Sequence, residues 1–191
     1  DGPLTGLSSS AGTLLMSASR DCTARLWDTR SRLGYVHVFQ GHSNTVTAAV
    51  LSKDGTYALT GSDDCTVKVW DLKSALTPLV TLKCGRKGVT ALSLASRSWL
   101  MAVVLDDGTT RVYNMGGAKT GLLSGTSEEN SRTSRFVTCC SWSPDESSIL
   151  TAGFDPSLIH RWHTPTSARG GRSPGALSDE GGHPDFESIP V

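Results

Sequence analysis

The sequence has no excess of charge of either sign and no long apolar run. Its 191 residues include 18 basic and 18 acidic side chains, so the formal net charge is zero. A neutral chain without a basic stripe offers no general attraction to nucleic acid or to an anionic membrane. The longest apolar run covers residues 99–105, whereas a membrane-spanning helix needs about 20 residues. We therefore expect neither nucleic-acid binding nor membrane insertion.

The sequence also lacks paired cysteines and the short motifs of common enzymes. Its five cysteines are odd in number and include no Cys-x-x-Cys pair, so neither a disulfide framework nor a zinc site is expected. No phosphate-binding loop, Gly-rich dinucleotide turn or His-Glu-x-x-His motif occurs. We expect a protein without catalytic activity, cofactor, metal or small-molecule substrate. Free thiols are typical of a reducing compartment, which favours the cytosol or the nucleus.

The chain does contain a repeat. Residues 19–28, 62–71 and 105–114 align without a gap, and Trp27 and Trp70 are 43 residues apart. Each stretch has an Asp, a Thr two residues later and an aromatic residue four further on. A period of 40 to 45 residues that ends in Trp-Asp is typical of propeller blades of four strands each. No apolar period of 3.6 residues of helical length appears, so we expect an all-β fold.

The second unit is the most complete, with strands expected at 36–39, 45–51, 57–62 and 66–70. The first unit, in the same register, aligns Pro3 with Val46 and Ser9 with Ser52. We therefore expect the chain to begin inside a blade. The third unit runs from about 78 to 123, and the fourth has strands at 136–142, 149–154 and 158–162. A loop at 116–135 is expected to connect the third unit to the strands of the fourth. We expect residues 1–163 to form about four blades of a seven-bladed ring, with the last blade lacking its outer strand. Residues 164–191 are rich in Gly, Pro and Ser and are expected to be a disordered tail.

The motifs Gly-His, Ser-x-Asp-x-Thr and Trp-Asp in residues 1–163 resemble the WD-repeat family of β-propellers. The resemblance implies a buried structural network of His42, Ser62, Asp64 and Trp70, with Thr60 as the alternative hydroxyl. Its counterparts in the other units are Asp21, Trp27 and Asp107. The third unit departs from the pattern, because Gly85, Leu105 and Tyr113 replace the His, the Ser and the Trp.

A His, an Asp and a Ser also match the residue types of a hydrolase triad. In this repeat they lie around a turn, where Trp70 would cover the hydroxyl instead of leaving it open to a cleft. We therefore favour the structural interpretation.

The resemblance implies a non-catalytic scaffold for protein–protein interactions. In the family, one face carries the residue between Ser and Asp of each Ser-x-Asp turn, together with residues before the innermost strand. Here the set is Arg20, Asp63, Asp106, Phe154, Asn44, Lys87 and Arg135. Mixed charges and an exposed aromatic residue are typical of binding surfaces. The alternative is a solvated loop rim without a partner.

Two further expectations concern partners. Trp27, Asp28 and Arg30 resemble the Trp-Asp-x-Arg box of substrate receptors for cullin-RING ubiquitin ligases, although an Arg exposed after a strand gives the same pattern. The segments 19–28, 38–42, 61–73 and 153–155 resemble one member of the family more closely. That resemblance implies a cytoplasmic and nuclear complex with phosphofurin acidic cluster sorting adaptors.

Overall fold

The structure is a computed structural model. It describes residues 2–10, 12–32, 34–73, 77–123, 137–153, 158–163 and 186–190. For residues 121–123, 158, 160 and 186–190, it describes the backbone alone. Every element in these ranges is a β-strand, and the strands form four antiparallel sheets of four. We call the sheets blades 1 to 4 in chain order.

The strands of each blade follow one another along the chain. Blade 1 contains β1 (Leu4–Ser9), β2 (Leu14–Ser19), β3 (Ala24–Asp28) and β4 (Tyr35–Phe39). Blade 2 contains β5 (Val46–Leu51), β6 (Tyr57–Ser62), β7 (Thr66–Asp71) and β8 (Val80–Lys83). Blade 3 contains β9 (Val89–Leu94), β10 (Leu100–Leu105), β11 (Thr110–Asn114) and β12 (Lys119–Leu123). Blade 4 contains β13 (Val137–Trp142), β14 (Ser148–Gly153), β15 (Leu158–His163) and β16 (Phe186–Pro190).

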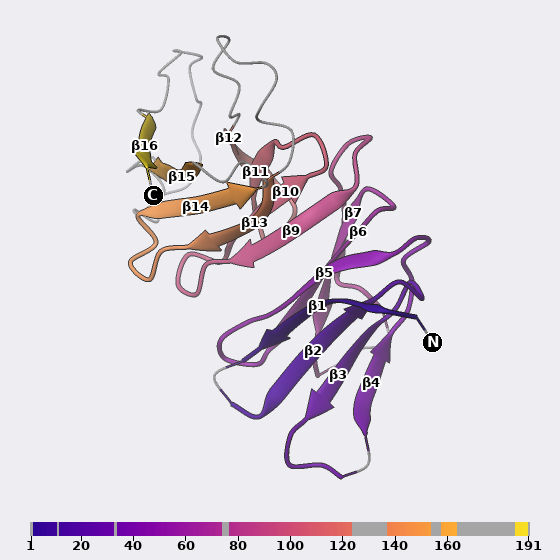
Figure 1. Ribbon diagram of the computed structural model, residues 1–191. Coiled ribbons are helices and arrows are strands. Elements are labelled where there is room, and N and C mark those ends of the chain that lie inside the picture. The colour runs from indigo at the N-terminus through magenta and orange to yellow at the C-terminus, as the bar shows by residue number, and fades with distance from the viewer. Residues whose placement is uncertain are drawn as a thin grey trace.

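The four blades follow one another in an arc, as neighbouring blades of a β-propeller do (Figure 1). Their inner strands meet in sequence, with β1 against β5, β5 against β9, and β9 against β13. An apolar cluster fills each of the three gaps between blades, and the largest includes Leu59, Val69, Val89 and Met101. Because burial of apolar surface drives folding, each blade is stabilised mainly by its neighbours. This all-β, propeller-like arrangement confirms the fold class predicted from the repeat.

Tight turns between the second and third strands explain two of the cysteines. Cys22 and Cys65 occupy the same place in blades 1 and 2, and both have a φ of 66°. Gly108 takes that place in blade 3 with a φ of 80°. A residue in the left-handed conformation lets the chain reverse direction between the two paired strands of each blade. The side chain of the preceding Asp accepts a hydrogen bond from the N–H of the following Thr in all three turns.

The predicted end of the propeller was wrong. Blade 4 does have an outer strand, because β16 pairs antiparallel with β15, with Ile159 opposite Ile189 and Trp162 opposite Phe186. Five residues of the segment expected to be disordered therefore belong to the sheet. Pairing satisfies backbone groups of β15 that would otherwise form an open edge. In the same way, β12 lies within the predicted 116–135 loop and completes blade 3.

The register predicted for the first unit was also wrong by one residue. Leu4 pairs with Ser19 as Val46 pairs with Ser62, so Leu4 and not Pro3 is the counterpart of Val46. The turn between β1 and β2 is one residue shorter than the turn between β5 and β6. The ungapped alignment therefore holds only from β2 onward.

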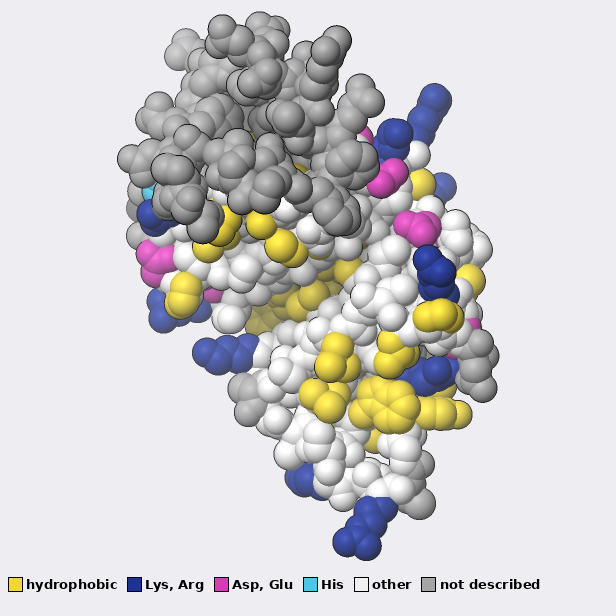
Figure 2. Space-filling view, viewed as in Figure 1, with side chains coloured by type: hydrophobic (Ala, Val, Ile, Leu, Met, Phe, Trp, Pro, Cys, Tyr) yellow, Lys and Arg dark blue, Asp and Glu magenta, His cyan; other side chains and the backbone are white. Residues whose placement is uncertain are grey.

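Blade 1 is less covered than blade 2. Hydrophobic side chains gather over blade 1 in the space-filling view (Figure 2), and Leu4, Leu7, Tyr35 and Val36 are among the large exposed apolar residues. Trp27 is half-buried, whereas Trp70 is 1% exposed. On the side that faces away from blade 2, blade 1 thus exposes apolar side chains. Between blades 2 and 3, side chains of this kind are buried against the neighbouring sheet.

Candidate functional site

A buried chain of hydrogen bonds holds blade 2 together. His42 lies before β5, and its Nδ1 donates to Asp64 Oδ2 at 2.8 Å. Its Nε2 lies 2.7 Å from Thr60 Oγ1, which also accepts the indole N–H of Trp70 at 2.9 Å. All contacts are satisfied when His42 is neutral and carries its proton on Nδ1. Buried polar groups cost little free energy only when each has a partner, and this network meets that condition.

Ser62 was the first choice from the sequence for the hydroxyl of this network, and that prediction was wrong. Thr60 takes this place. Its Oγ donates to Asn44 O at 3.1 Å and accepts the N–H of Asp64 at 3.1 Å. Thr60 and Ser62 share a face of β6, and the position of the Trp70 ring decides which of the two hydroxyls joins the network. Trp70 pairs with Ala58, so the indole reaches the neighbouring Thr60 diagonally and does not reach the strand end. Ser62 instead fixes the turn.

The electrostatics of blade 2 match a structural network. Burial lowers the pKa of His42 despite its bond to Asp64, so the imidazole is neutral. Burial alone would raise the pKa of Asp64, but hydrogen bonds from Thr66, His42 and Ser43 lower it, so Asp64 is a carboxylate. The hydroxyls of Thr60 and Ser62 are fully buried. No nucleophile among these residues faces solvent, and the arrangement does not support a hydrolase site.

Other blades repeat parts of the network with different partners. The indole N–H of Trp27 donates to Ser17 Oγ at 2.9 Å, and that of Trp162 donates to Thr151 Oγ1 at 2.8 Å. Asp21 bonds to Arg25 at 2.8 Å, where Asp64 has His42. The hydroxyl partners of Trp27 and Trp162 were missed from the sequence. A Ser or Thr about ten residues before each Trp was the signal that could have found them.

Blade 3 replaces the network with apolar packing and one arginine. Val103 and Tyr113 are buried at the places of Thr60 and Trp70. Gly85 stands at the place of His42 with a φ of 117°, and a Cβ there would lie 3.2 Å from Arg111 Nη1. Arg111 donates to the carbonyl of Cys84, so its guanidinium uses the space that a histidine would fill. Burial raises the pKa of Cys84 to about 11, which keeps this thiol protonated.

The charged residues predicted to bind a partner lie at one end of the blades. Arg20, Asp63 and Asp106 are exposed in the equivalent turns of blades 1, 2 and 3. Partial burial and the negative charge of Asp106 raise the pKa of Asp63, whereas the positive charge of Arg20 lowers it. These influences place the three charges within electrostatic reach of one another. We call this surface the turn face, and it consists of Arg20, Asn44, Asp63, Lys87 and Asp106.

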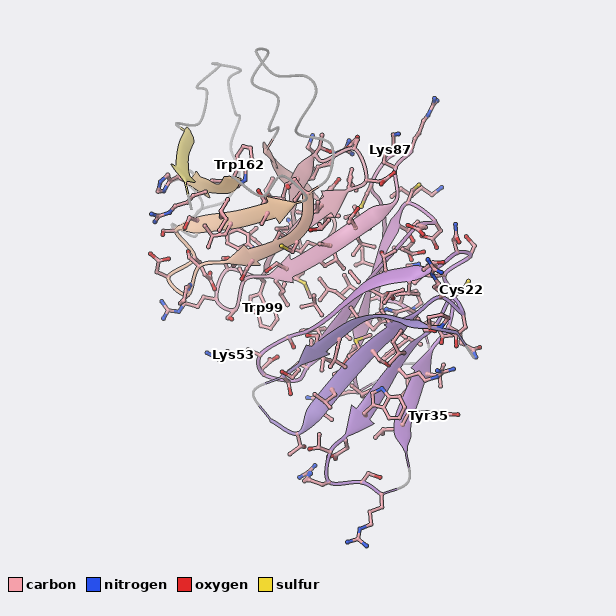
Figure 3. All side chains as sticks on the ribbon, in the orientation of Figure 1. Cys22, Tyr35, Lys53, Lys87, Trp99 and Trp162 are labelled. Atoms are coloured by element: carbon pink, nitrogen blue, oxygen red, sulfur yellow. The ribbon has the colours of Figure 1, made fainter. Side chains whose placement is uncertain are left out.

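Asn44 and Lys87 are exposed beside the inner strands β5 and β9. Figure 3 labels Lys87 of the turn face and Cys22 at the same ends of the blades, whereas Lys53 and Trp99 lie at the other ends of the strands. Asp63 lies against the next blade, because a Cβ on Gly88 would be 2.9 Å from Asp63 Oδ1. Phe154 and Arg135, which were predicted to join this surface, lie outside the described residues.

The predicted ligase box spans the end of β3, at the end of blade 1 opposite the turn face. Arg30 is 74% exposed, and its Nε and Nη2 donate to the two carboxylate oxygens of Asp28 at 3.1 and 2.9 Å. These bonds hold the pKa of Asp28 well below its usual range. Trp27 is committed to Ser17 within the blade. Of the three box residues, Arg30 is the one available to a partner, in an orientation fixed by Asp28.

Comparison with known proteins supports the repeat. A family model described as "WD domain, G-beta repeat" (WD40) matches residues 1–28, 34–71 and 123–159, more than half of the chain. The match omits the stretch that holds most of blade 3, in which Gly85 and Tyr113 replace the His and the Trp. No curated protein matches the chain. The described ranges contain no group of His, Cys, Asp and Glu suited to a metal ion, and they contain no helix able to cross a membrane.

Proposed function

Because the chain belongs to the WD-repeat family, a class of protein–protein interaction scaffolds, we propose that it binds a protein partner through the turn face. The observation that carries this proposal is the recurrence of Arg20, Asp63 and Asp106 at one position in three successive blades. The loops carrying them are exposed, whereas the strands that position them are rigidly packed. Neighbouring charges of opposite sign favour a partner with a complementary pattern and orient it on approach.

The proposal is tested by affinity purification with the full chain, identification of co-purifying proteins and titration of the variant R20E against the protein recovered. We expect R20E to weaken binding by about 1 kcal/mol or more and to leave the unfolding midpoint unchanged. The matched control is R32E, the same charge reversal on an exposed residue beyond β3. Equal affinity of R20E and wild type would place binding on another surface.

The identity of the partner is a finer proposal. The chain resembles WD repeat-containing protein 37 in the segments 19–28, 38–42, 61–73 and 153–155, and that resemblance supports a complex with phosphofurin acidic cluster sorting adaptors in the cytoplasm and nucleus. Co-purification of the full chain with such an adaptor, compared with R20E, tests the complex. Imaging of the tagged chain tests the location. If such an adaptor binds neither the wild-type chain nor R20E, this candidate partner is excluded, and the turn-face proposal is unaffected.

A second candidate function is that of a substrate receptor for a cullin-RING ubiquitin ligase. Its support is Arg30, which is exposed and held in one orientation by Asp28, so little side-chain entropy is lost on binding. The variant R30A is expected to abolish co-purification with the ligase adaptor while the fold stays intact. Absence of the adaptor from purifications of the wild-type chain would exclude this candidate.

A further inference from the structure

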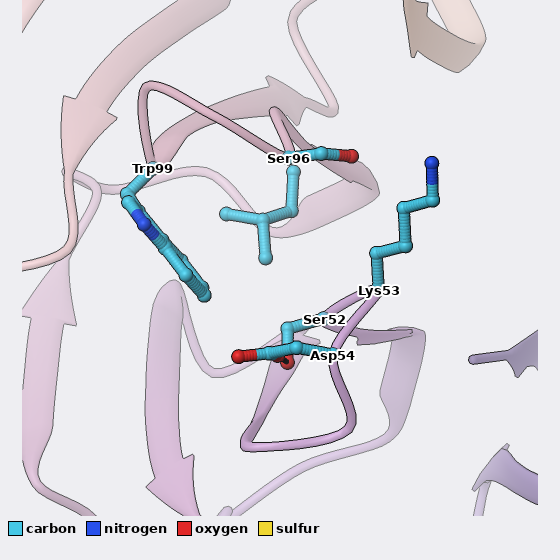
Figure 4. A pocket seen from close by; sticks show the side chains of 6 residues that line it. Ser52, Lys53, Asp54, Ser96 and Trp99 are labelled. Atoms are coloured by element: carbon cyan, nitrogen blue, oxygen red, sulfur yellow. Dashed lines mark hydrogen bonds between the residues drawn. The ribbon is translucent and has the colours of Figure 1, made fainter. Parts of the chain in front are cut away.

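The ends of the blades opposite the turn face carry a groove between blades 2 and 3. One part is a cavity of about 230 Å³ lined by Ser52, Lys53, Asp54, Leu94, Ser96 and Trp99. Figure 4 shows the Trp99 ring and the Lys53 side chain on opposite sides of this cavity, with Ser52 and Asp54 below them. We call this part the Lys53 cavity.

A second hollow of about 500 Å³ shares Trp99 with the first and is lined mainly by apolar side chains, among them Leu79, Val80 and Met115. Leu79 is 55% exposed there. Tyr57 packs edge-to-face on Trp99, with ring centroids 5.6 Å apart. Aromatic residues fixed in this way are frequent anchors of protein interfaces. The two hollows therefore form one groove with an aromatic wall between a polar part and an apolar part.

The backbone at Trp99 is strained. Its φ is 55°, and a bulky residue in the left-handed region is an outlier that other contacts must maintain. The contact comes from blade 4, where the carboxylate of Glu146 accepts hydrogen bonds from the backbone N–H groups of Arg97 and Ser98 at 2.5 and 2.9 Å. The turn that presents Trp99 is thus held from a neighbouring blade. Strain of this kind is concentrated at binding and catalytic sites.

The two charged side chains that line the Lys53 cavity, Lys53 and Asp54, differ in their partners. The carboxylate of Asp54 accepts hydrogen bonds from Ser52 Oγ at 2.6 Å and from Thr56 Oγ1 at 2.7 Å, so it is occupied within its own turn. Lys53 is exposed and has no ion-pair partner among the described residues. A ligand that fills the groove therefore meets an ammonium group without an ion-pair partner, beside an indole ring and an apolar hollow. This chemistry complements a carboxylate next to a large apolar side chain.

We propose that this groove binds an extended segment of a partner protein in which an acidic residue adjoins a large apolar residue. The apolar side chain enters the hollow beside Leu79 and Met115 and packs on Trp99, and the carboxylate pairs with Lys53. The site is separate from the turn face, so the protein has two binding surfaces at opposite ends of its strands. The groove proposal does not depend on the turn-face proposal.

The experiment uses a phage-displayed library of random heptapeptides selected against the full chain, followed by fluorescence anisotropy with the enriched peptides. We expect enriched peptides to combine Asp or Glu with Leu, Phe or Trp. K53E and L79D are each expected to weaken binding about tenfold or more, because they remove the charge and apolar contacts of an anchor. K87E, the same charge reversal on the turn face, is the matched control and is expected to bind like wild type.

W99G separates binding from folding. Glycine adopts a positive φ without strain, so this variant is expected to keep the fold while losing the aromatic wall and the affinity. The proposal is overturned if no peptide is enriched, if enriched peptides lack acidic residues, or if K53E, L79D and W99G bind them as wild type does. Self-association of the wild-type chain that W99G abolishes would also overturn it, because the occupant would then be a second copy. R20E tests the turn face in the same preparations, so the two proposals fail separately.

Discussion

Blades 2 and 3 have the same four strands, but their interiors differ in chemistry. Blade 2 connects His42, Asp64, Thr60 and Trp70 through hydrogen bonds. Blade 3 has Val103 and Tyr113 in the corresponding interior positions, and the Arg111 guanidinium lies beside Gly85. The pairing of the second and third strands is equally regular in both. The network is therefore one of two ways to fill a blade, and the strand order depends on apolar packing between blades.

The largest effect is expected from W70A. The Trp70 side chain is fully buried and packs on Phe39 of blade 1, with ring centroids 5.2 Å apart. Its truncation leaves a cavity and is expected to cost about 3–5 kcal/mol, measured by denaturant unfolding. W70F retains a ring but loses the N–H donor, and a smaller loss is expected. Equal losses for the two variants would mean that volume contributes nothing, contrary to the packing.

A smaller loss, about 2 kcal/mol, is expected for H42A, because the Asp64 carboxylate keeps its buried position without one of its partners. Blade 3 shows that an apolar interior is tolerated when the polar partners are absent together. The double variant H42A/T60V, which approaches blade 3, is therefore expected to be less destabilised than the two single variants predict by addition. Strict additivity in this double-mutant cycle would show that His42 and Thr60 do not interact.

The network also predicts a pH dependence that blade 3 lacks. Burial lowers the pKa of His42 below its usual 6.5, so the unfolded chain takes up a proton at a higher pH than the folded chain. The contribution of His42 is complete above about pH 6.5 and declines as the pH falls toward the lowered pKa. Unfolding free energies of wild type and H42A are expected to converge across this window. Parallel curves would indicate that His42 titrates normally.

The smallest effect on stability is expected from R30A. Arg30 is exposed and bonds to Asp28 on the surface, and such pairs contribute little, so the unfolding midpoint is expected to stay close to that of wild type. Arg111 of blade 3 makes the informative comparison, because it is half-buried and donates to the Cys84 carbonyl. R111A is expected to destabilise more than R30A in the same unfolding assay. The reverse order would mean that Arg111 does not support blade 3.

The repeat predicted the fold because its signals are local. Asp64 and Thr66 define a turn, Trp70 marks the strand that follows, and the 43-residue spacing of Trp27 and Trp70 places these elements in successive blades. The choice of Thr60 over Ser62 was not accessible in this way. Both hydroxyls alternate onto the same face of β6, and the direction of the Trp70 ring selects between them.

Features that depend on distant parts of the chain were not predicted from the sequence. The outer strand β16 follows a long Gly- and Pro-rich stretch, and nothing local to residues 186–190 indicates pairing with β15. The strained Trp99 depends on Glu146, 47 residues later. The sequence shows that Gly85 replaces the His in blade 3, but the position of Arg111 is also basic in the other two units, at Arg25 and Lys68. Only the fold brings those two positions together.

The contact between Glu146 and the turn at residues 97–98 has a further consequence for how the blades communicate. Glu146 belongs to blade 4, whereas Trp99 contacts Tyr57 of blade 2. A displacement of blade 4 that withdrew the carboxylate would release the two backbone N–H groups, and the strained turn would lose the contact that holds it. The groove between blades 2 and 3 thus depends for its aromatic wall on a carboxylate that neither of these blades supplies.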